Sequence, residues 1–478
     1  MKLRMKGGEF DTMAMKKVHK HPFIEYGLRT QESKKQMKEA ENHLPGGVTA
    51  NIKYFAPYPV VMEKGKGAWI KDVDGHWYVD YLMGYGSLAL GHGDETVKEA
   101  IFQQLKKDGT LLFGTPHRLE LEFAMKIQDY FPSIEKVRYT NSGTEATQLA
   151  IRLAQVFTGK KRIAKCEGHY HGGYKEMLYS INPSLEEAGE EAAPYPVPES
   201  AGVEVDGQEP VILPFNHIEG MEKLLNKYKD QLAAVVIEPV QAGFIPADQE
   251  YMNRLRQLTQ KYNVVLIYDE VKTGFRSSLG GAQNVYQIEP DLTTLGKVIG
   301  GGFPFGVVGG KSEIMDLTSP IRGADVFEAG SKGKGTARDI LFHSGTYNGH
   351  PTILAAGLAT MNKLDQQFDQ ILRYTDELRN GIEGIGKRVG LPLKTCGIGS
   401  IFNVIWNEET NLRHYRDLQK TNTKLRRELD FELMRAGVYT KPLNRYSISA
   451  AHGEDELTFT LKAYEKACRN LKGGAGVS

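Results

Sequence analysis

Three short segments of the chain place chemically useful side chains beside apolar or glycine-rich sequence. Asp269 follows the apolar run 264–268, and its carboxylate could hold a proton on a pyridine-type nitrogen. Lys297 lies among apolar residues just before three glycines, where burial would lower the pKa of its amine and favour Schiff-base chemistry. Residues 142–144 (Ser-Gly-Thr) form a turn before a predicted helix, where hydroxyls and free backbone N–H groups favour a phosphate.

Each of these features alone has a common structural explanation. The turn could be an ordinary helix cap, Asp269 a surface carboxylate and Lys297 a solvated amine. Together, a phosphate cup, an acidic partner and an activated lysine describe a pyridoxal 5'-phosphate (PLP) site. A nucleoside triphosphate site is disfavoured because the sequence contains no G-x-x-x-x-G-K-[ST] motif. A dinucleotide site is disfavoured because no G-x-G-x-x-G motif stands at the start of a helix.

The elements that must position these residues alternate between strands and helices. Apolar periodicity predicts a helix that begins after Asp94 and stops at Gly109. A strand over 136–140 leads through the 142–144 turn into a helix closed by Gly159. Strands at 232–237 and 264–268 flank a helix at 249–262. This order predicts an α/β fold with a mostly parallel central sheet.

The same reading divides the chain into segments. We predict a large PLP-binding domain over 85–345 and a smaller α+β domain built from both chain ends, residues 13–84 and 346–478. Residues 1–12 are interpreted as a remnant added upstream of the natural chain. The Glu-, Pro- and Gly-rich stretch 184–210 is predicted to be a surface excursion, and 330–335 (GSKGKG) a second loop.

Composition narrows the function classes. The 478 residues carry 60 Lys and Arg against 59 Asp and Glu, and a net charge of +1 makes nucleic acid a poor partner. No apolar run approaches the roughly 20 residues that a membrane helix requires. The three cysteines show no C-x-x-C spacing, so neither a disulfide framework nor a zinc site is expected. A reducing cytoplasm is the expected location.

Six motifs then resemble one known family, the class III aminotransferases of PLP fold type I. The likeness runs from about residue 45 to 465 and is strongest to the branch of glutamate-1-semialdehyde 2,1-aminomutase, D-phenylglycine aminotransferase and β-phenylalanine aminotransferase. The motifs are SGTEA (142–146), YHG (170–172), EP (238–239), DEVKTGFR (269–276), PDLTTLGKVIGGG (290–302) and HSGTYNGHP (343–351).

The resemblance implies roles for individual residues. Lys297 would form the internal aldimine and shuttle the proton, Asp269 would pair with the pyridine nitrogen, and Tyr170 would stack on the ring opposite Val271. The expected phosphate ligands are Ser142, Gly143, Thr144 and, in the neighbouring subunit of an obligate homodimer, Thr346. Asn216 is expected near the phenolic oxygen, and Glu238 is expected to brace that side of the site.

Substrate recognition departs from the family pattern. The carboxylate-binding arginine of the aminomutases is replaced by Lys53, and that of the β-phenylalanine enzymes by Ala50. Lysine keeps the charge but loses the planar guanidinium fork. Arg445 could take over the binding of the substrate carboxylate, or it could form a surface or interdomain salt bridge. Tyr85 occupies the position where the aminomutase has a tryptophan, and it is expected to form part of the wall of the substrate pocket.

The resulting expectation is an aminotransferase that moves an amino group from a β- or aromatic amino acid to a 2-oxo acid. Glutamate-1-semialdehyde 2,1-aminomutase is the alternative, and residues 449–452 (SAAH) lean toward it. A PLP-dependent racemase or epimerase comes third. A non-catalytic PLP-binding protein is disfavoured because Lys297 and Asp269 are both present. His169 and His171 are interpreted as structural, and no metal site is predicted.

Overall fold

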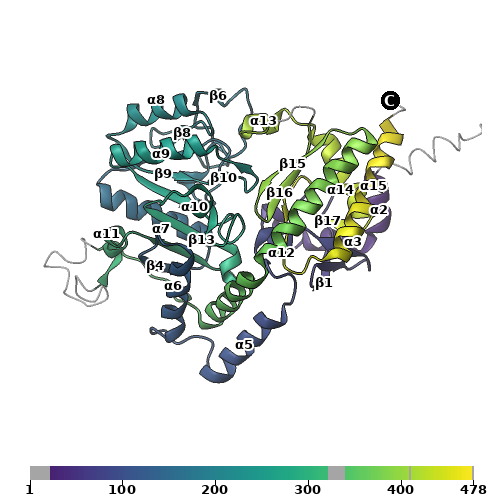
Figure 1. Ribbon diagram of the computed structural model, residues 1–478, viewed down its shortest axis with the longest axis horizontal. Helices are drawn as coiled ribbons and strands as arrows, with labels where there is room; N and C mark the ends of the chain where they lie inside the picture. Colours follow the sequence, from purple (N-terminus) through teal and green to yellow (C-terminus); the bar gives the residue numbers. More distant parts are fainter. Residues whose placement is uncertain (1–21, 321–339, 408–410, 476–478) are drawn as a thin grey trace, which may run out of the picture.

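The computed structural model describes residues 22–320, 340–407 and 411–475. Two lobes lie side by side, and the long helix α12 (Pro351–Val389) runs along the junction between them (Figure 1). The predicted remnant 1–12 and the predicted loop 330–335 lie outside the described residues. Among the described helices, none is both long and apolar enough to cross a membrane.

The larger lobe contains a seven-stranded sheet in which only β14 runs antiparallel to its neighbours. This arrangement confirms the predicted α/β fold with a mostly parallel sheet. The strand order is β4 (Lys136–Thr140), β14 (Gly306–Gly310), β13 (Leu292–Gly296), β12 (Val265–Asp269), β9 (Leu232–Ile237), β5 (Arg162–Cys166) and β8 (Val211–Leu213).

Helices cover this sheet, and its central strands are buried throughout, as expected for parallel strands enclosed on both faces. The helices of this lobe are α6 (Arg118–Tyr130), α7 (Gly143–Thr158), α8 (Ile218–Tyr228), α9 (Gln249–Lys261), α10 (Gly281–Tyr286) and α11 (Ser312–Met315). The lobe also contains three single helical turns, η3 (Lys175–Met177), η4 (Lys297–Gly300) and η5 (Asp316–Thr318). Two further pairs of short strands belong to it: β6 (Gly189–Glu190) with β7 (Ala193–Pro194), and β10 (Val240–Gln241) with β11 (Ile245–Pro246). The β6–β7 pair belongs to the stretch 184–210 and forms a separate sheet apart from the central one.

The smaller lobe combines both ends of the chain. Strand β17 (Val438–Tyr439) pairs in parallel with β3 (Trp77–Asp80), so a late segment completes a sheet begun by β1 (Met62–Lys66) and β2 (Trp69–Asp72). A second sheet joins β15 (Leu393–Ile398), β16 (Ile401–Trp406) and β18 (Tyr446–Ser447). The remaining elements are α2 (Pro22–Arg29), α3 (Gln31–Ala40), η1 (Pro45–Gly47), η2 (Asn51–Lys53), α4 (Met83–Gly86), α13 (Tyr415–Gln419), α14 (Thr423–Arg435) and α15 (Glu454–Ala475). The boundaries at residues 84 and 345 stay a prediction.

Local signals fixed the helix ends as the sequence predicts. Helix α5 (Glu95–Asp108) begins where the Asp94 carboxylate accepts hydrogen bonds from the amides of Thr96 (3.0 Å) and Val97 (3.3 Å). It ends at Gly109, whose φ of 67° is the left-handed conformation that glycine adopts without strain.

A buried guanidinium ties the two lobes together. Arg276 is 1% exposed, and its Nη2 donates to the carbonyl of Gly86 (2.8 Å) while its Nη1 donates to that of Ile448. These bonds connect the turn after β12 to two segments of the smaller lobe. The 83–86 turn, in which Gly84 and Tyr85 both have positive φ, is thereby held over the carboxyl edge of the large sheet.

Candidate active site

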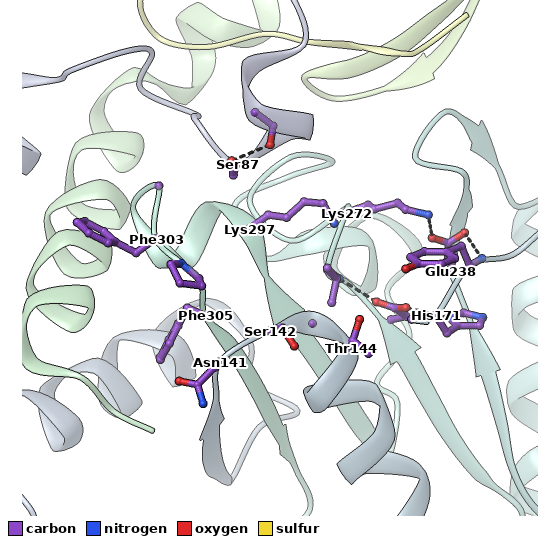
Figure 2. A pocket seen from close by; sticks show the side chains of 18 residues that line it. Ser87, Asn141, Ser142, Thr144, His171, Glu238, Lys272, Lys297, Phe303 and Phe305 are labelled. Atoms are coloured by element: carbon purple, nitrogen blue, oxygen red, sulfur yellow. Dashed lines mark hydrogen bonds and ion pairs between the residues drawn. The ribbon is translucent and has the colours of Figure 1, made fainter. Parts of the chain in front are cut away.

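A cavity of about 360 Å³ opens at the carboxyl edge of the central sheet, where ligands of open parallel sheets bind. Eight of the predicted site residues line it (Figure 2). They are Ser142, Gly143, Thr144, Tyr170, Glu238, Asp269, Val271 and Lys297. These eight residues follow the ends of five different strands. Because the strands end at the same edge of the sheet, side chains up to 155 positions apart in the sequence lie close together.

Lys297 is the first residue after β13 and has a φ of 49°, a strained conformation for a residue with a side chain. Burial, together with the positive charges of Lys272 and Arg445, lowers the pKa of its amine from 10.5 to about 7. A large fraction of Lys297 is therefore an uncharged nucleophile near neutral pH, which is the state that Schiff-base chemistry requires.

Asp269 ends the adjacent strand β12 and is held by three hydrogen bonds. Its Oδ2 accepts from Nδ1 of His171 at 2.8 Å, and its Oδ1 accepts from the amide of Val271 at 3.1 Å and the hydroxyl of Thr294 at 3.3 Å. Burial raises the pKa of this carboxyl, but the His171 bond and the neighbouring positive charges outweigh it and hold the pKa below its usual value. Asp269 thus remains an anion able to pair with a protonated ring nitrogen.

The phosphate turn joins β4 to α7. The Ser142 hydroxyl caps α7 by accepting a hydrogen bond from the Glu145 amide at 3.1 Å. Glycine is required at 143, because a Cβ there would lie 2.7 Å from the Val271 side chain. The turn therefore packs directly against Val271, while the N-terminus of a 16-residue helix faces the cavity.

Tyr170 and Glu238 form the far wall together with an unpredicted residue, Lys272. The Glu238 carboxylate accepts from the Tyr170 amide at 3.4 Å and forms an ion pair with the Lys272 ammonium. The Lys272 Nζ lies 5.5 Å from the centre of the Tyr170 ring, within cation–π range. Glu238 therefore braces Tyr170 and Lys272 at once.

Two residues expected at the cofactor do not line the cavity. Asn216 uses its side chain to donate to the carbonyls of Pro246 (3.1 Å) and Arg413 (2.7 Å), and it accepts from the Asp248 amide (2.7 Å). These bonds engage the buried Asn216 side chain outside the cavity lining, and its contact with the phenolic oxygen stays a prediction. Thr346 is exposed on the surface, and its expected contact with a neighbouring subunit stays a prediction.

The three predicted substrate residues lie together in the smaller lobe, next to the lining residue Gly84, but none of them is itself part of the cavity lining. The Tyr85 hydroxyl donates to the carbonyl of Ile52 at 2.7 Å, and its own carbonyl accepts from Nη2 of Arg445 at 3.2 Å. Lys53 is exposed and donates to the Thr49 hydroxyl at 2.8 Å. Arg445 is the better placed cation, because it acts electrostatically on Lys297 while Lys53 faces solvent.

Sequence reasoning missed several residues of the site. His171 was interpreted as structural, yet it orients Asp269, and His169 accepts a hydrogen bond from the Glu238 amide at 3.1 Å. The H-x-H spacing was a usable signal, since it places both rings beside the motif that supplies Tyr170. Further lining residues that were not predicted are Gly84, Ser87, Asn141, Gly172, Lys272, Gly302, Phe303, Pro304 and Phe305. Within the described part of the chain, no cluster of three metal-ligating side chains occurs.

Comparison with known proteins places the chain among amino-group-transferring enzymes. The family model described as "Aminotransferase class-III" matches residues 53–449. A glutamate-1-semialdehyde 2,1-aminomutase from Ignicoccus hospitalis is 40% identical over 90% of this chain and 97% of its own length. Further relatives that are 36 to 38% identical carry the same name.

Solved structures are similar over nearly the whole chain. An omega-transaminase from Sphaerobacter thermophilus superimposes with a TM-score of 0.84 at 35% identity, covering 92% of this chain and 97% of that one. A structure titled "Transaminase with PLP bound" gives a TM-score of 0.81 at 29% identity, covering 93% of this chain and 99% of that one.

These relatives contradict the expected function. The prediction of an aminotransferase for β- or aromatic amino acids is wrong, because the curated relatives that match nearly end to end are aminomutases. That prediction depended on the replacement of two arginines by Ala50 and Lys53. Both positions lie in an exposed segment that does not line the cavity, so the replacements carry little information about the substrate.

The cofactor is pyridoxal 5'-phosphate, and the described residues fit it. The turn at Ser142, Gly143 and Thr144 would hold the phosphate, and the Asp269 carboxylate would hold the protonated ring nitrogen. The Lys297 amine lines the same cavity, and its pKa of about 7 makes the uncharged form available near neutral pH. The glycine at 143 leaves room for backbone approach that any Cβ would block.

The low pKa of Lys297 makes a prediction about cofactor capture. Because protonated ammonium cannot attack the aldehyde, the rate at which apoprotein attaches PLP covalently should rise with pH and level off above about 7. Samples are quenched with borohydride at set times, and the fraction of protein that carries the cofactor is measured by mass spectrometry of the intact protein. Lys297→Met should add no mass at any pH. A rate that continues to rise toward pH 10.5, the value of an ordinary lysine, would show that the amine is not desolvated.

Proposed function

The chain belongs to the class III aminotransferase family, and from this premise we propose that it is a glutamate-1-semialdehyde 2,1-aminomutase. The observation that carries the proposal is 40% identity to such an enzyme over 90% of this chain and 97% of the relative. The cavity supports it, since it holds the lysine, the carboxylate and the phosphate turn that an amino-group exchange through PLP requires.

The proposed reaction is an isomerisation. The substrate carries an amino group on C2 and an aldehyde on C1, and the two groups exchange positions to give 5-amino-4-oxopentanoate. No second substrate is consumed, and no net oxidation or reduction occurs. When bound, PLP supplies an electron sink conjugated to the carbon that bears the nitrogen.

The residues of the chain supply orientation and proton transfer. The Lys297 amine takes the proton from the substrate carbon and returns it, which its lowered pKa allows near neutral pH. Asp269, fixed by His171, keeps the ring nitrogen protonated. Phe303, with Pro304 and Phe305, forms an apolar section of the cavity wall.

The direct test supplies glutamate-1-semialdehyde to the purified holoprotein without any 2-oxo acid. We expect stoichiometric conversion to 5-amino-4-oxopentanoate by the wild-type protein and no conversion by Lys297→Ala. Chromatography with mass spectrometry measures the product. Turnover that requires a 2-oxo acid, or exchange of the α-hydrogen for deuterium with inversion of an amino acid and no isomerisation, would contradict the proposal. The second result would indicate a racemase or epimerase.

We assign the substrate carboxylate to Arg445, which the smaller lobe presents beside Tyr85. Its Nε is buried and lacks a hydrogen-bond partner within the described ranges, so a donor is available. Arg445→Met should raise KM at least about tenfold, because a charge-assisted hydrogen bond is lost. Arg445→Lys should recover only part of the loss, since an ammonium lacks the planar fork.

Lys53→Met is the matched control for Arg445→Met. It removes an exposed positive charge from the smaller lobe, outside the cavity lining, and steady-state kinetics should show little change. A larger effect on KM from Lys53→Met than from Arg445→Met would reverse the assignment.

The chain is further proposed to act as a homodimer in the cytoplasm. The segment that carries Thr346 is joined to the start of α6 by the contact between His117 and the carbonyl of Gly349 (2.8 Å), and large apolar side chains in and before α6 and beside Thr346 are exposed. The exposed side chains are Leu111, Phe113, Leu121, Met125 and Tyr347. Sedimentation equilibrium should give twice the chain mass, and a monomer at micromolar concentration would contradict the dimer. The three free thiols are consistent with a reducing compartment.

A further inference from the structure

Lys272 is a second lysine of the cavity, and the predicted chemistry leaves it unused. It follows Val271 in the turn after β12 and lines the cavity with Lys297. Its ammonium pairs with the Glu238 carboxylate, and the two side chains are 13% and 2% exposed. An ion pair buried to this extent is held firmly, because separating it would leave an uncompensated charge out of water.

Glu238 anchors this lysine to the rest of the wall. Besides the ion pair, its carboxylate accepts from the amides of Tyr170 (3.4 Å) and Ala242 (3.2 Å). Although burial raises the pKa of the Glu238 carboxyl, the Lys272 charge holds that pKa below its usual value. The pair is therefore charged, and the Lys272 ammonium is fixed 5.5 Å from the centre of the Tyr170 ring.

The substituents of the cofactor show which part of it would meet this ammonium. In PLP the ring nitrogen is opposite the aldehyde carbon, and the phosphate arm and the phenolic oxygen lie on opposite sides of that axis. In the protein, Asp269 marks the nitrogen end and Lys297 the aldehyde end. The turn at 142–144 marks the phosphate side. The phenolic oxygen must then face the remaining side.

Lys272 occupies that remaining side. Figure 2 shows Ser142 and Thr144 below the cavity, His171, which binds Asp269, at the lower right, Lys297 above, and Lys272 at the upper right beside Glu238. Asn216, expected at the phenolic oxygen, is bonded elsewhere and does not line the cavity. The position is thus left to Lys272.

We propose that Lys272, held by Glu238, presents its ammonium to the phenolic oxygen of the bound cofactor and stabilises that oxygen as an anion. The ammonium also repels a proton on the Lys297 nitrogen, in keeping with its depressing effect on the pKa of Lys297. This role depends on the PLP site and not on which substrate the enzyme uses.

Other charged groups also act on this part of the cavity and must stay constant in a test. They are Glu238, Asp269, Lys297, Lys165, His169, His171 and Arg445. A change confined to Lys272 keeps all of these side chains, but it also leaves the Glu238 carboxylate without its counter-ion, so a shift in the titration of the bound cofactor reports the loss of the Lys272–Glu238 ion pair.

The test compares Lys272→Met with the wild-type holoprotein by two measurements that need no substrate. Loss of the cation should raise the pH midpoint of the cofactor's visible absorbance change by about one unit, because the protonated form is no longer disfavoured. The dissociation constant for PLP should rise roughly tenfold. Lys272→Arg keeps the charge and should hold the midpoint near that of the wild type.

Two further variants keep the test decisive. Lys272→Gln can still donate to Glu238 and protects the fold if Lys272→Met fails to accumulate, and its midpoint should also rise. Lys311→Met removes a lysine from an ion pair with Asp291 (2.6 Å) outside the cavity and should leave the midpoint unchanged. An unchanged midpoint in the folded Lys272→Met or Lys272→Gln protein would overturn the proposal, even if PLP binding weakened.

Discussion

The site depends on one constraint, that parallel strands of the central sheet end at a common edge. Strands β12 and β13 are neighbours, with Asp269 paired in register with Thr294. Asp269 and Lys297 therefore emerge side by side, a carboxylate and an amine on adjacent strand ends. The turn after β4 reaches the same edge through β14, which brings the phosphate turn within range of both.

Burial then gives these two groups opposite tasks. At Asp269, burial raises the pKa, but the hydrogen bonds from His171 and two further donors outweigh this effect, so the carboxylate stays ionised. At Lys297 the effect of burial is reinforced by nearby positive charges, so the amine loses its proton readily. One anion and one uncharged nucleophile in a shared cavity are what a pyridine-based aldehyde cofactor needs.

Much of this arrangement could be predicted from the sequence, because local signals determine it. Asp94 and Gly109 fix the ends of α5, and the apolar run before Asp269 fixes a strand end. The pairings across the cavity could not be predicted in this way. His171 meets Asp269 across 98 positions, and Glu238 meets Lys272 across 34, with no periodicity to indicate either contact. The exposure of Lys53 was equally hidden, and overrating that residue led to the wrong substrate class.

The most direct measurement of the central claim is the protonation of the ring nitrogen in the bound cofactor. Holoprotein prepared with PLP labelled with ¹⁵N in the ring can be followed by NMR as the pH is raised. The account predicts that the wild-type nitrogen keeps its proton to a higher pH than free PLP does, and that Asp269→Asn loses this effect. Loss of the proton at the same pH in both proteins would contradict the account.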